Sequence, residues 1–311
     1  MPMGGTAVND KSLGRLTKLV GLLILAAGTV GAQAGSSNST EDWAALIGNR
    51  YSIHSNLTYK VAAGYEAKLD VYAPRRGEGP FSTVMNIHGG GWTGGTKEAL
   101  ALRLMPYLQM GLAVVNVEYR LARISLAPAA VQDCRCALQW VIRNAETYKF
   151  DTARIVVTGS SAGGHLSLMT GILDPSAGLD DECPGNEKLA VAAIVNFYGI
   201  TDVVDLLDGP HRQTYAVAWL GGMENREAVA RRVSPLTYVR EGLPPILTIH
   251  GDADTIVPYV HATRMHQELD RLRVPNQLLT IPGGKHGGFT DEQTLQIDRV
   301  IRAFLTKHDI L

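Results

Sequence analysis

The sequence predicts an α/β fold: a mostly parallel, doubly wound sheet with helices on both faces and a small cap insertion. Short, nearly continuous apolar runs bounded by glycine or proline recur along the chain, as expected of strands buried on both faces. Longer amphipathic stretches lie between them, and strands that alternate with helices pair in parallel through right-handed crossovers. The chain has 311 residues, of which 45% are hydrophobic, so it can bury such a core within one domain.

The expected elements follow in a regular order. Two extended pieces around 57–61 and 67–72 share a short link, which favours an antiparallel edge. Buried strands are expected at 83–87, 113–117, 155–158, 191–196, 246–249 and 278–281, and helices at 97–109, 129–147, 164–173, 259–272 and 291–307. Residues 35–49 are polar and predict a loose lead-in. The interval 201–239 breaks the alternation and is the candidate cap or lid.

The first 34 residues differ from the rest. Basic residues precede an apolar run over 19–30, and the small-residue sequence Ala32-Gln33-Ala34 follows. This is the order of regions in a secretory signal peptide. The run is shorter than the roughly 20 apolar residues that a membrane-spanning helix needs. We therefore expect a signal peptide over 1–34, cleaved near Ala34/Gly35, and a secreted or periplasmic domain over 35–311 without a stable membrane anchor.

Charge and cysteine content narrow the partners and the redox chemistry. With 29 basic and 30 acidic residues, the chain offers no reason to expect a nucleic-acid partner. An exported protein can oxidise two of its cysteines. Cys134 and Cys136 are two apart on a predicted helix and point to different faces, so either one could pair with Cys183. No histidine or second cysteine pair lies nearby at ligand spacing, so no metal site is expected.

Ser161 is the predicted nucleophile. It is the central residue of Gly159-Ser160-Ser161-Ala162-Gly163, a match to the loose pattern G-x-S-x-G. The match gains specificity because an apolar strand signal precedes it and a helical stretch follows it. Such a strand–turn–helix strains its central residue and exposes it at the carboxyl end of the sheet. Ser160 is the rival serine but lacks the flanking glycines.

A glycine-rich loop after the strand at 83–87 reads His88-Gly89-Gly90-Gly91-Trp92. Glycines let backbone N–H groups face a ligand, and acyl transfer needs such donors for its oxyanion. We assign this oxyanion-hole role to the N–H groups of Gly90, Gly91 and Ala162. A phosphate-binding loop is disfavoured because no Lys-Ser/Thr pair follows. Trp92 is a tentative substrate-binding residue that either lines the acyl pocket or covers the sheet edge.

A serine nucleophile needs a base that is oriented by an acid. His286 follows the strand at 278–281 on a glycine-flanked loop and is the predicted base. Asp254 and Asp252 compete for the acid role; Asp254 is favoured because it lies at the far end of its loop, while Asp252 is expected to brace that loop. The resulting order, serine, aspartate, histidine, is typical of one hydrolase fold. His250 and His165 are read as a structural partner and a packing residue, respectively.

Four motifs together resemble the α/β-hydrolase superfamily: HGGGW, GSSAGGH, HGDADTIVP and GGKHGGF, in that order. More narrowly, they resemble the bacterial esterase/lipase branch related to hormone-sensitive lipase and to feruloyl-esterase-like proteins, as does EYRLA at 118–122. The resemblance implies the α/β-hydrolase fold, Asp254 as triad acid and a structural role for Asp133. The long N-terminal cap helices of the hormone-sensitive-lipase branch are not found, so its substrate pockets are not transferred.

The sequence thus predicts an exported serine carboxylic-ester hydrolase that works through an acyl-enzyme and needs no metal or organic cofactor. Its expected partner is a small-molecule or polysaccharide-linked ester. An amide hydrolase, either a peptidase or a formamidase, would use the same triad and stays open. A non-catalytic binding protein is disfavoured because no triad member is missing. The natural ester and the oligomeric state are not determined by the sequence.

Overall fold

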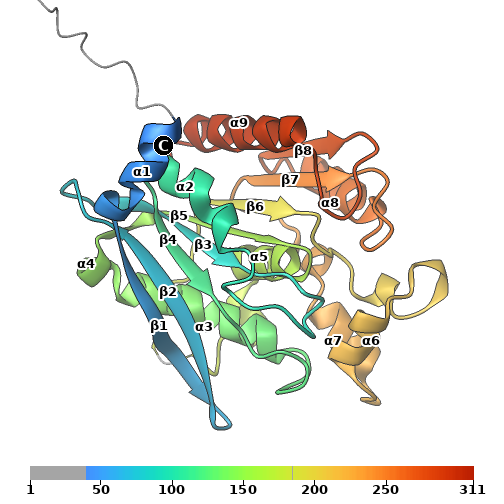
Figure 1. The fold of residues 1–311 in the computed structure, drawn as a ribbon. Helices are drawn as coiled ribbons and strands as arrows, with labels where there is room; N and C mark the ends of the chain where they lie inside the picture. The colour runs from blue at the N-terminus through green and yellow to red at the C-terminus, as the bar shows by residue number, and fades with distance from the viewer. Residues whose placement is uncertain (1–39, 184) are drawn as a thin grey trace, which may run out of the picture.

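A twisted sheet forms the centre of the computed structural model, which describes residues 40–183 and 185–311 (Figure 1). Within this part of the chain the sheet has eight strands in the order β1-β2-β4-β3-β5-β6-β7-β8. Strand β2 pairs antiparallel with both β1 and β4, and all other neighbours pair in parallel. The predicted fold class and its antiparallel edge are therefore confirmed.

The strands are β1 (Tyr51–Ala62), β2 (Tyr65–Pro74), β3 (Phe81–Ile87), β4 (Ala113–Val117), β5 (Phe150–Ser160), β6 (Ala193–Phe197), β7 (Ile246–Gly251) and β8 (Asn276–Ile281). The helices are α1 (Thr40–Arg50), α2 (Met105–Gln109), α3 (Ala129–Arg143), α4 (Ala145–Tyr148), α5 (Ala162–Ile172), α6 (Thr214–Leu220), α7 (Arg226–Arg232), α8 (Val260–Arg271) and α9 (Asp291–Lys307). The apolar strand signals arise because the central strands are buried on both faces: every residue of β4 and β7 is buried.

Helices cover both faces of the sheet (Figure 1). One apolar cluster joins α2 and α9 to the sheet, including Leu108 and Phe304. The other face is covered by α3, α5 and α8, through residues such as Leu138, Leu166 and Met265. This two-faced packing holds the carboxyl ends of the parallel strands at one common edge, where loops can carry function.

Two local expectations were wrong. The lead-in over 35–49 is helical from Thr40 onward as α1, because Ile47 packs against the α2–α9 cluster and this contact outweighs a polar composition. The helix expected over 97–109 is a turn followed by a short 3-10 helix (Ala101–Leu104) and by α2, which starts around Pro106. A proline is favoured in a first helical turn because its missing N–H has no partner there.

The N-terminal 39 residues lie outside the described part, and so does the expected signal peptide over 1–34. No helix within the described ranges is long and apolar enough to cross a membrane. Those ranges also contain no group of three or more His, Cys, Asp or Glu side chains arranged to hold a metal ion.

The structure resolves the cysteine pairing. Cys136 on α3 forms a disulfide with Cys183, 47 residues later, and Cys134 is a buried free thiol. The alternative pairing of Cys134 with Cys183 is wrong, because positions two apart on a helix face different directions and only Cys136 faces the segment that follows α5. Burial raises the pKa of the Cys134 thiol, which keeps it protonated.

The interval 201–239 lies beyond the carboxyl end of β6 and holds α6, α7 and three short 3-10 helices, as the gold segment of Figure 1 shows. It is tied to the sheet rather than loose. Trp219 of α6 stacks on Trp92 with ring centroids 4.1 Å apart, and the Val233 carbonyl accepts a hydrogen bond of 2.6 Å from His165 Nε2.

His165 is a packing residue, as expected, and it is neutral. The Trp92 indole N–H donates to its Nδ1 at 3.2 Å, so the ring proton must lie on Nε2, which donates to Val233. Burial lowers the pKa of His165 from its usual value of 6.5 to about 4. The His165 ring therefore links α5, which begins directly after Ser161, to the glycine-rich loop and to the 201–239 segment only while the ring carries no charge.

This histidine is expected to make the fold sensitive to acid. Between about pH 6.5 and pH 4 the unfolded chain binds a proton at His165 that the folded chain does not. The free energy of unfolding therefore decreases by about 3 kcal/mol as the pH is lowered through this range. Urea unfolding of His165→Gln should lose less stability between pH 7.5 and pH 4.5 than the parent. The exposed His54→Gln serves as the matched control, and an equal loss in all three proteins would contradict the assignment.

Candidate active site

Ser161 lies between β5 and α5 in a strained conformation. Its φ is 57° and its ψ is −121°, values that a non-glycine residue adopts only where the surroundings hold it. A Cβ added to Gly159 would lie 2.5 Å from the Ile87 carbonyl oxygen, and one on Gly163 would lie 2.1 Å from the same atom. The flanking glycines are thus required because the turn passes against β3, which leaves the Ser161 side chain facing outward.

The three residues predicted as a triad are brought together from three separate loops. His286 Nε2 lies 2.8 Å from Ser161 Oγ, and His286 Nδ1 lies 2.7 Å from Asp254 Oδ2. The distances match those of a nucleophile, base and orienting acid. His286 is partly exposed, whereas the Asp254 side chain is fully buried.

Asp254 is held as a carboxylate. Its Oδ1 accepts the backbone N–H groups of Ile256 and Val257 at 2.8 and 3.0 Å, and its Oδ2 faces two imidazoles. Burial alone would raise the pKa of this carboxyl, but hydrogen bonds from His250, His286 and a backbone N–H hold it well below its usual range. Such an acid stays ionised near neutral pH and can stabilise a protonated His286.

Two neighbouring residues take the supporting positions expected of them. His250 is fully buried, and its Nε2 lies 2.9 Å from the Val257 carbonyl oxygen and 3.3 Å from Asp254 Oδ2. The exposed Asp252 accepts the Gly283 N–H at 2.7 Å and so ties the acid loop to the loop that carries His286. Asp252 has no contact with the imidazole, which leaves Asp254 as the acid partner.

The glycine-rich loop faces the same space as Ser161. Gly90 and Gly91 have φ values of 119° and 58°, and both border the cavity above Ser161. Side chains are excluded there: a Cβ on Gly90 would lie 2.1 Å from the Gly94 carbonyl oxygen. Within the described part of the chain, the N–H groups of Gly90, Gly91 and Ala162 donate to no backbone carbonyl. Gly90 and Gly91 thus border the same cavity as Ser161 and His286.

Trp92 does not line the cavity. Its side chain is fully buried between the stacked Trp219 ring and the edge-on ring of His165. The tentative substrate-binding role is therefore wrong, because the positive φ of Trp92, 57°, turns its indole away from the catalytic cavity and under the 201–239 segment. Trp92 instead anchors that segment to the sheet.

Asp133 has the structural position implied by the family resemblance. It is fully buried on α3 and accepts hydrogen bonds from the backbone N–H and guanidinium of Arg120 at 2.7 to 3.0 Å. Lys60 lies 3.2 Å from the same carboxylate. These contacts hold the loop after β4 against α3.

A cavity of about 440 Å³ opens above Ser161. It is bordered by Ser161 and His286, by the glycine-rich loop, and by residues from the following turn and the 201–239 segment. Tyr215 of α6 forms part of its wall, and its hydroxyl donates to the Ile256 carbonyl at 3.1 Å. This volume lies within the usual range of pockets that bind small molecules.

Two lining residues were missed by the sequence reasoning. Tyr198 follows β6, and its ring packs against the His286 ring at a centroid distance of 4.6 Å. Its hydroxyl accepts a hydrogen bond of 3.1 Å from Arg103 Nη1. The position of Tyr198 at the carboxyl end of a parallel strand was a usable signal, whereas nothing in the sequence around Arg103 placed it near the triad.

Comparison with known proteins gives one family match. The model of the BD-FAE family matches residues 69–269, a span that contains the glycine-rich loop, Ser161 and Asp254. His286 lies beyond it. The match covers well over half of the chain.

Two similar proteins come from Mycobacterium tuberculosis. Esterase LipC is 28% identical over 218 residues, which are 67% of this chain and 53% of LipC. The probable carboxylic ester hydrolase LipM is 30% identical over 191 residues, which are 59% of this chain and 44% of LipM. The chain thus spans about half the length of the curated relatives it matches.

Solved structures share the overall fold of this chain. A truncated carbohydrate esterase from gut microbiota superposes with a TM-score of 0.71 at 26% identity, covering 83% of this chain and 98% of that one. Esterase Est2 of Thermogutta terrifontis has a TM-score of 0.70 at 24% identity, covering 84% and 94%, and supports the fold alone. Family match and topology together place this chain in the BD-FAE family of α/β-hydrolase proteins.

Proposed function

We propose that this protein hydrolyses carboxylic esters through a Ser161–His286–Asp254 triad and an acyl-enzyme. One observation carries the proposal: an unbroken series of hydrogen bonds runs from Asp254 through His286 to Ser161 Oγ, and it ends in an open cavity bordered by Gly90 and Gly91. The names of the relatives, esterase and carboxylic ester hydrolase, support the same reaction.

The proposed reaction has two steps. His286 Nε2 takes the proton of Ser161 Oγ as that oxygen attacks the ester carbonyl carbon, and the carbonyl oxygen becomes an anion held by the N–H groups of Gly90, Gly91 and Ala162. The C–O bond to the alcohol then breaks, and the alcohol leaves with the proton from His286. Water, deprotonated by His286, attacks the acyl-enzyme, releases the carboxylic acid and returns the proton to Ser161.

Asp254 acts throughout as an orienting carboxylate. It keeps the His286 proton on Nδ1, so that Nε2 is free to accept from Ser161. Tyr198 packs on the face of the same imidazole and limits its movement. The strained Ser161 backbone lies at the N-terminus of α5, where the helix dipole favours the developing negative charge.

An active-site-directed organophosphonate tests this proposal. The reagent phosphonylates a serine only where a base activates it, so we expect one adduct per chain, on Ser161, located by mass spectrometry of peptides. Prior replacement of His286 by alanine should slow labelling by at least about 100-fold. An adduct on another residue, or none on an intact protein, would contradict the proposed nucleophile.

The substrate class and the location belong to the same proposal. An exported enzyme acting on small or polysaccharide-linked esters fits the resemblance to a carbohydrate esterase. The Cys136–Cys183 disulfide supports export, since disulfides persist in oxidising compartments. The 201–239 segment would act as a small cap, because Tyr215 supplies one wall of the cavity.

A further inference from the structure

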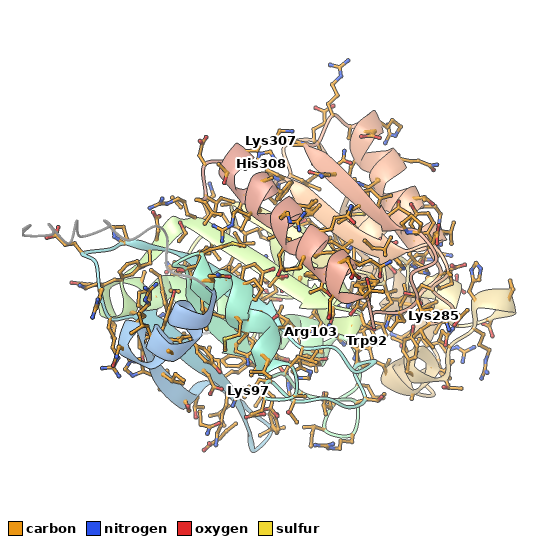
Figure 2. All side chains as sticks on the ribbon, turned by 45° about the horizontal axis from the view of Figure 1, so that its top comes forward. Trp92, Lys97, Arg103, Lys285, Lys307 and His308 are labelled. Carbon is orange, nitrogen blue, oxygen red and sulfur yellow. A yellow bond between two sulfur atoms is a disulfide. The ribbon has the colours of Figure 1, made fainter. Side chains whose placement is uncertain are left out.

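Arg103 is the charged side chain at the catalytic cavity that the reaction above does not use. It lies on the 3-10 helix before α2 and borders the cavity above Ser161. It also borders a smaller cavity of about 60 Å³ and a groove of about 350 Å³ that runs along α9. Figure 2 shows Arg103 close to the N-terminal end of α9. The Arg103 side chain therefore borders all three cavities.

The Arg103 guanidinium has N–H donors that are not used in hydrogen bonds within the described residues. One N–H bonds to the Tyr198 hydroxyl at 3.1 Å, and a guanidinium carries five. Among the residues that the structure describes, no carboxylate lies within ion-pair distance of Arg103. This contrasts with the buried Arg120 and Arg135, whose guanidinium groups are paired with Asp133 and Asp180.

The cavity around it carries no compensating negative charge. None of its described lining residues is an aspartate or a glutamate. Glu98, on the same segment, is engaged by Lys97. Asp298 borders only the two neighbouring hollows, and burial raises its pKa toward the neutral form. A bound anion would thus meet a positive group and no opposing carboxylate.

The Tyr198 contact holds Arg103 near the reaction. Tyr198 is only 4% exposed, and its ring packs against His286. The hydrogen bond to the Tyr198 hydroxyl therefore places the Arg103 guanidinium near the triad. An arginine at this position presents paired N–H groups that match the two oxygens of a carboxylate. Lysine would offer only a point charge.

We propose that Arg103 is a specificity residue that binds a carboxylate on the substrate, so that the preferred esters are acidic ones. The inference rests on the proposed ester hydrolysis at Ser161. The substrate class is an ester whose acyl or alcohol part carries a free carboxylate within a few bonds of the scissile group, as in a half-ester of a dicarboxylic acid or an acylated sugar acid. Arg103 takes no part in bond making or breaking.

The test uses two matched pairs of substrates, assayed by chromatography of the released acid. Monoethyl succinate against ethyl butyrate places the carboxylate on the acyl side; O-acetylglycolate against propyl acetate places it on the alcohol side. We expect the parent protein to prefer the anionic member of at least one pair in kcat/KM. In Arg103→Met that preference ratio should fall by roughly 10- to 100-fold, the effect of losing a charge-assisted hydrogen bond.

Two further variants make the result specific. Arg103→Lys keeps the charge without the fork and should give an intermediate ratio. Arg76→Met removes the same charge from the exposed loop between β2 and β3, at the opposite ends of the strands, and should keep the parent ratio. Raising the salt concentration to about 0.5 M should lower the ratio in the parent and not in Arg103→Met, because salt screens partly exposed charges.

The outcomes separate the two proposals. Hydrolysis that continues near the parent rate in Ser161→Ala, or no hydrolysis of any of the four esters by the parent, overturns the proposed function and this inference with it. Ser161-dependent hydrolysis with an unchanged ratio in Arg103→Met overturns the carboxylate site alone. An equal loss on neutral and anionic esters also overturns it, because Arg103 would then act only by positioning Tyr198 against His286.

Discussion

Replacing Ser161 with alanine is expected to lower kcat for ester hydrolysis by about 10⁴- to 10⁶-fold. The residual rate would come from the backbone donors of the glycine-rich loop and from substrate binding, which the substitution leaves in place. The measurement is steady-state hydrolysis of a short-chain p-nitrophenyl ester by the purified variant. Its thermal unfolding should match that of the parent or exceed it, because alanine removes a side chain and no packing contact.

The adjacent serine provides the matched control. Ser160 also borders the cavity, but its hydroxyl is not within hydrogen-bond distance of the imidazole, whereas Ser161 Oγ is 2.8 Å from it. Ser160→Ala should therefore keep activity within a few-fold of the parent. A Ser160→Ala variant that is inactive beside an active Ser161→Ala variant would reverse the assignment of the nucleophile.

Replacing Asp254 with asparagine should lower kcat by about 10⁴-fold while the protein stays folded. The Asp254 carboxylate accepts the His286 Nδ1–H at 2.7 Å. An asparagine amide can instead donate to Nδ1, which moves the ring proton to Nε2. The imidazole then cannot accept the proton of Ser161. The pH–rate profile and the circular dichroism spectrum of the variant measure the two parts of this expectation.

Asp252→Asn is the control for this variant. Asp252 is two residues away and accepts the Gly283 N–H at 2.7 Å, a hydrogen bond that an asparagine oxygen can also accept. We expect activity within about threefold of the parent, because the Gly283 N–H keeps its hydrogen bond and only exchanges a charged acceptor oxygen for a neutral one. A larger loss in Asp252→Asn than in Asp254→Asn would mean that the acid had been assigned to the wrong aspartate.

Much of the fold could be predicted because its signals are local. An apolar run buried on both faces predicts a strand wherever it occurs, and the run at 113–117 coincides with β4. Helix ends were predicted less well: the stretch at 129–147 is divided at Asn144 into α3 and α4. Short-range preferences of single residues decide such boundaries, and they are weak beside tertiary contacts.

The sequence by itself determined the chain order of the eight strands in the described residues, most of the helices that cover them, and the motif positions of Ser161, Asp254 and His286. These residues were identifiable because a strand that turns sharply into a helix needs glycines at fixed offsets, and because loops at the carboxyl ends of parallel strands share one edge. The structure adds that His286 lies within hydrogen-bond distance of both Ser161 and Asp254.

Only the tertiary structure decided which side chains surround them. It turned Trp92 away from the cavity, selected Cys136 over Cys134 for the disulfide, and placed Tyr198 against His286 with Arg103 bound to the Tyr198 hydroxyl. Each outcome depends on the direction of a side chain relative to a segment distant in sequence. A pattern of residue types carries no such information, because periodicity reports which face is buried and not which partner covers it.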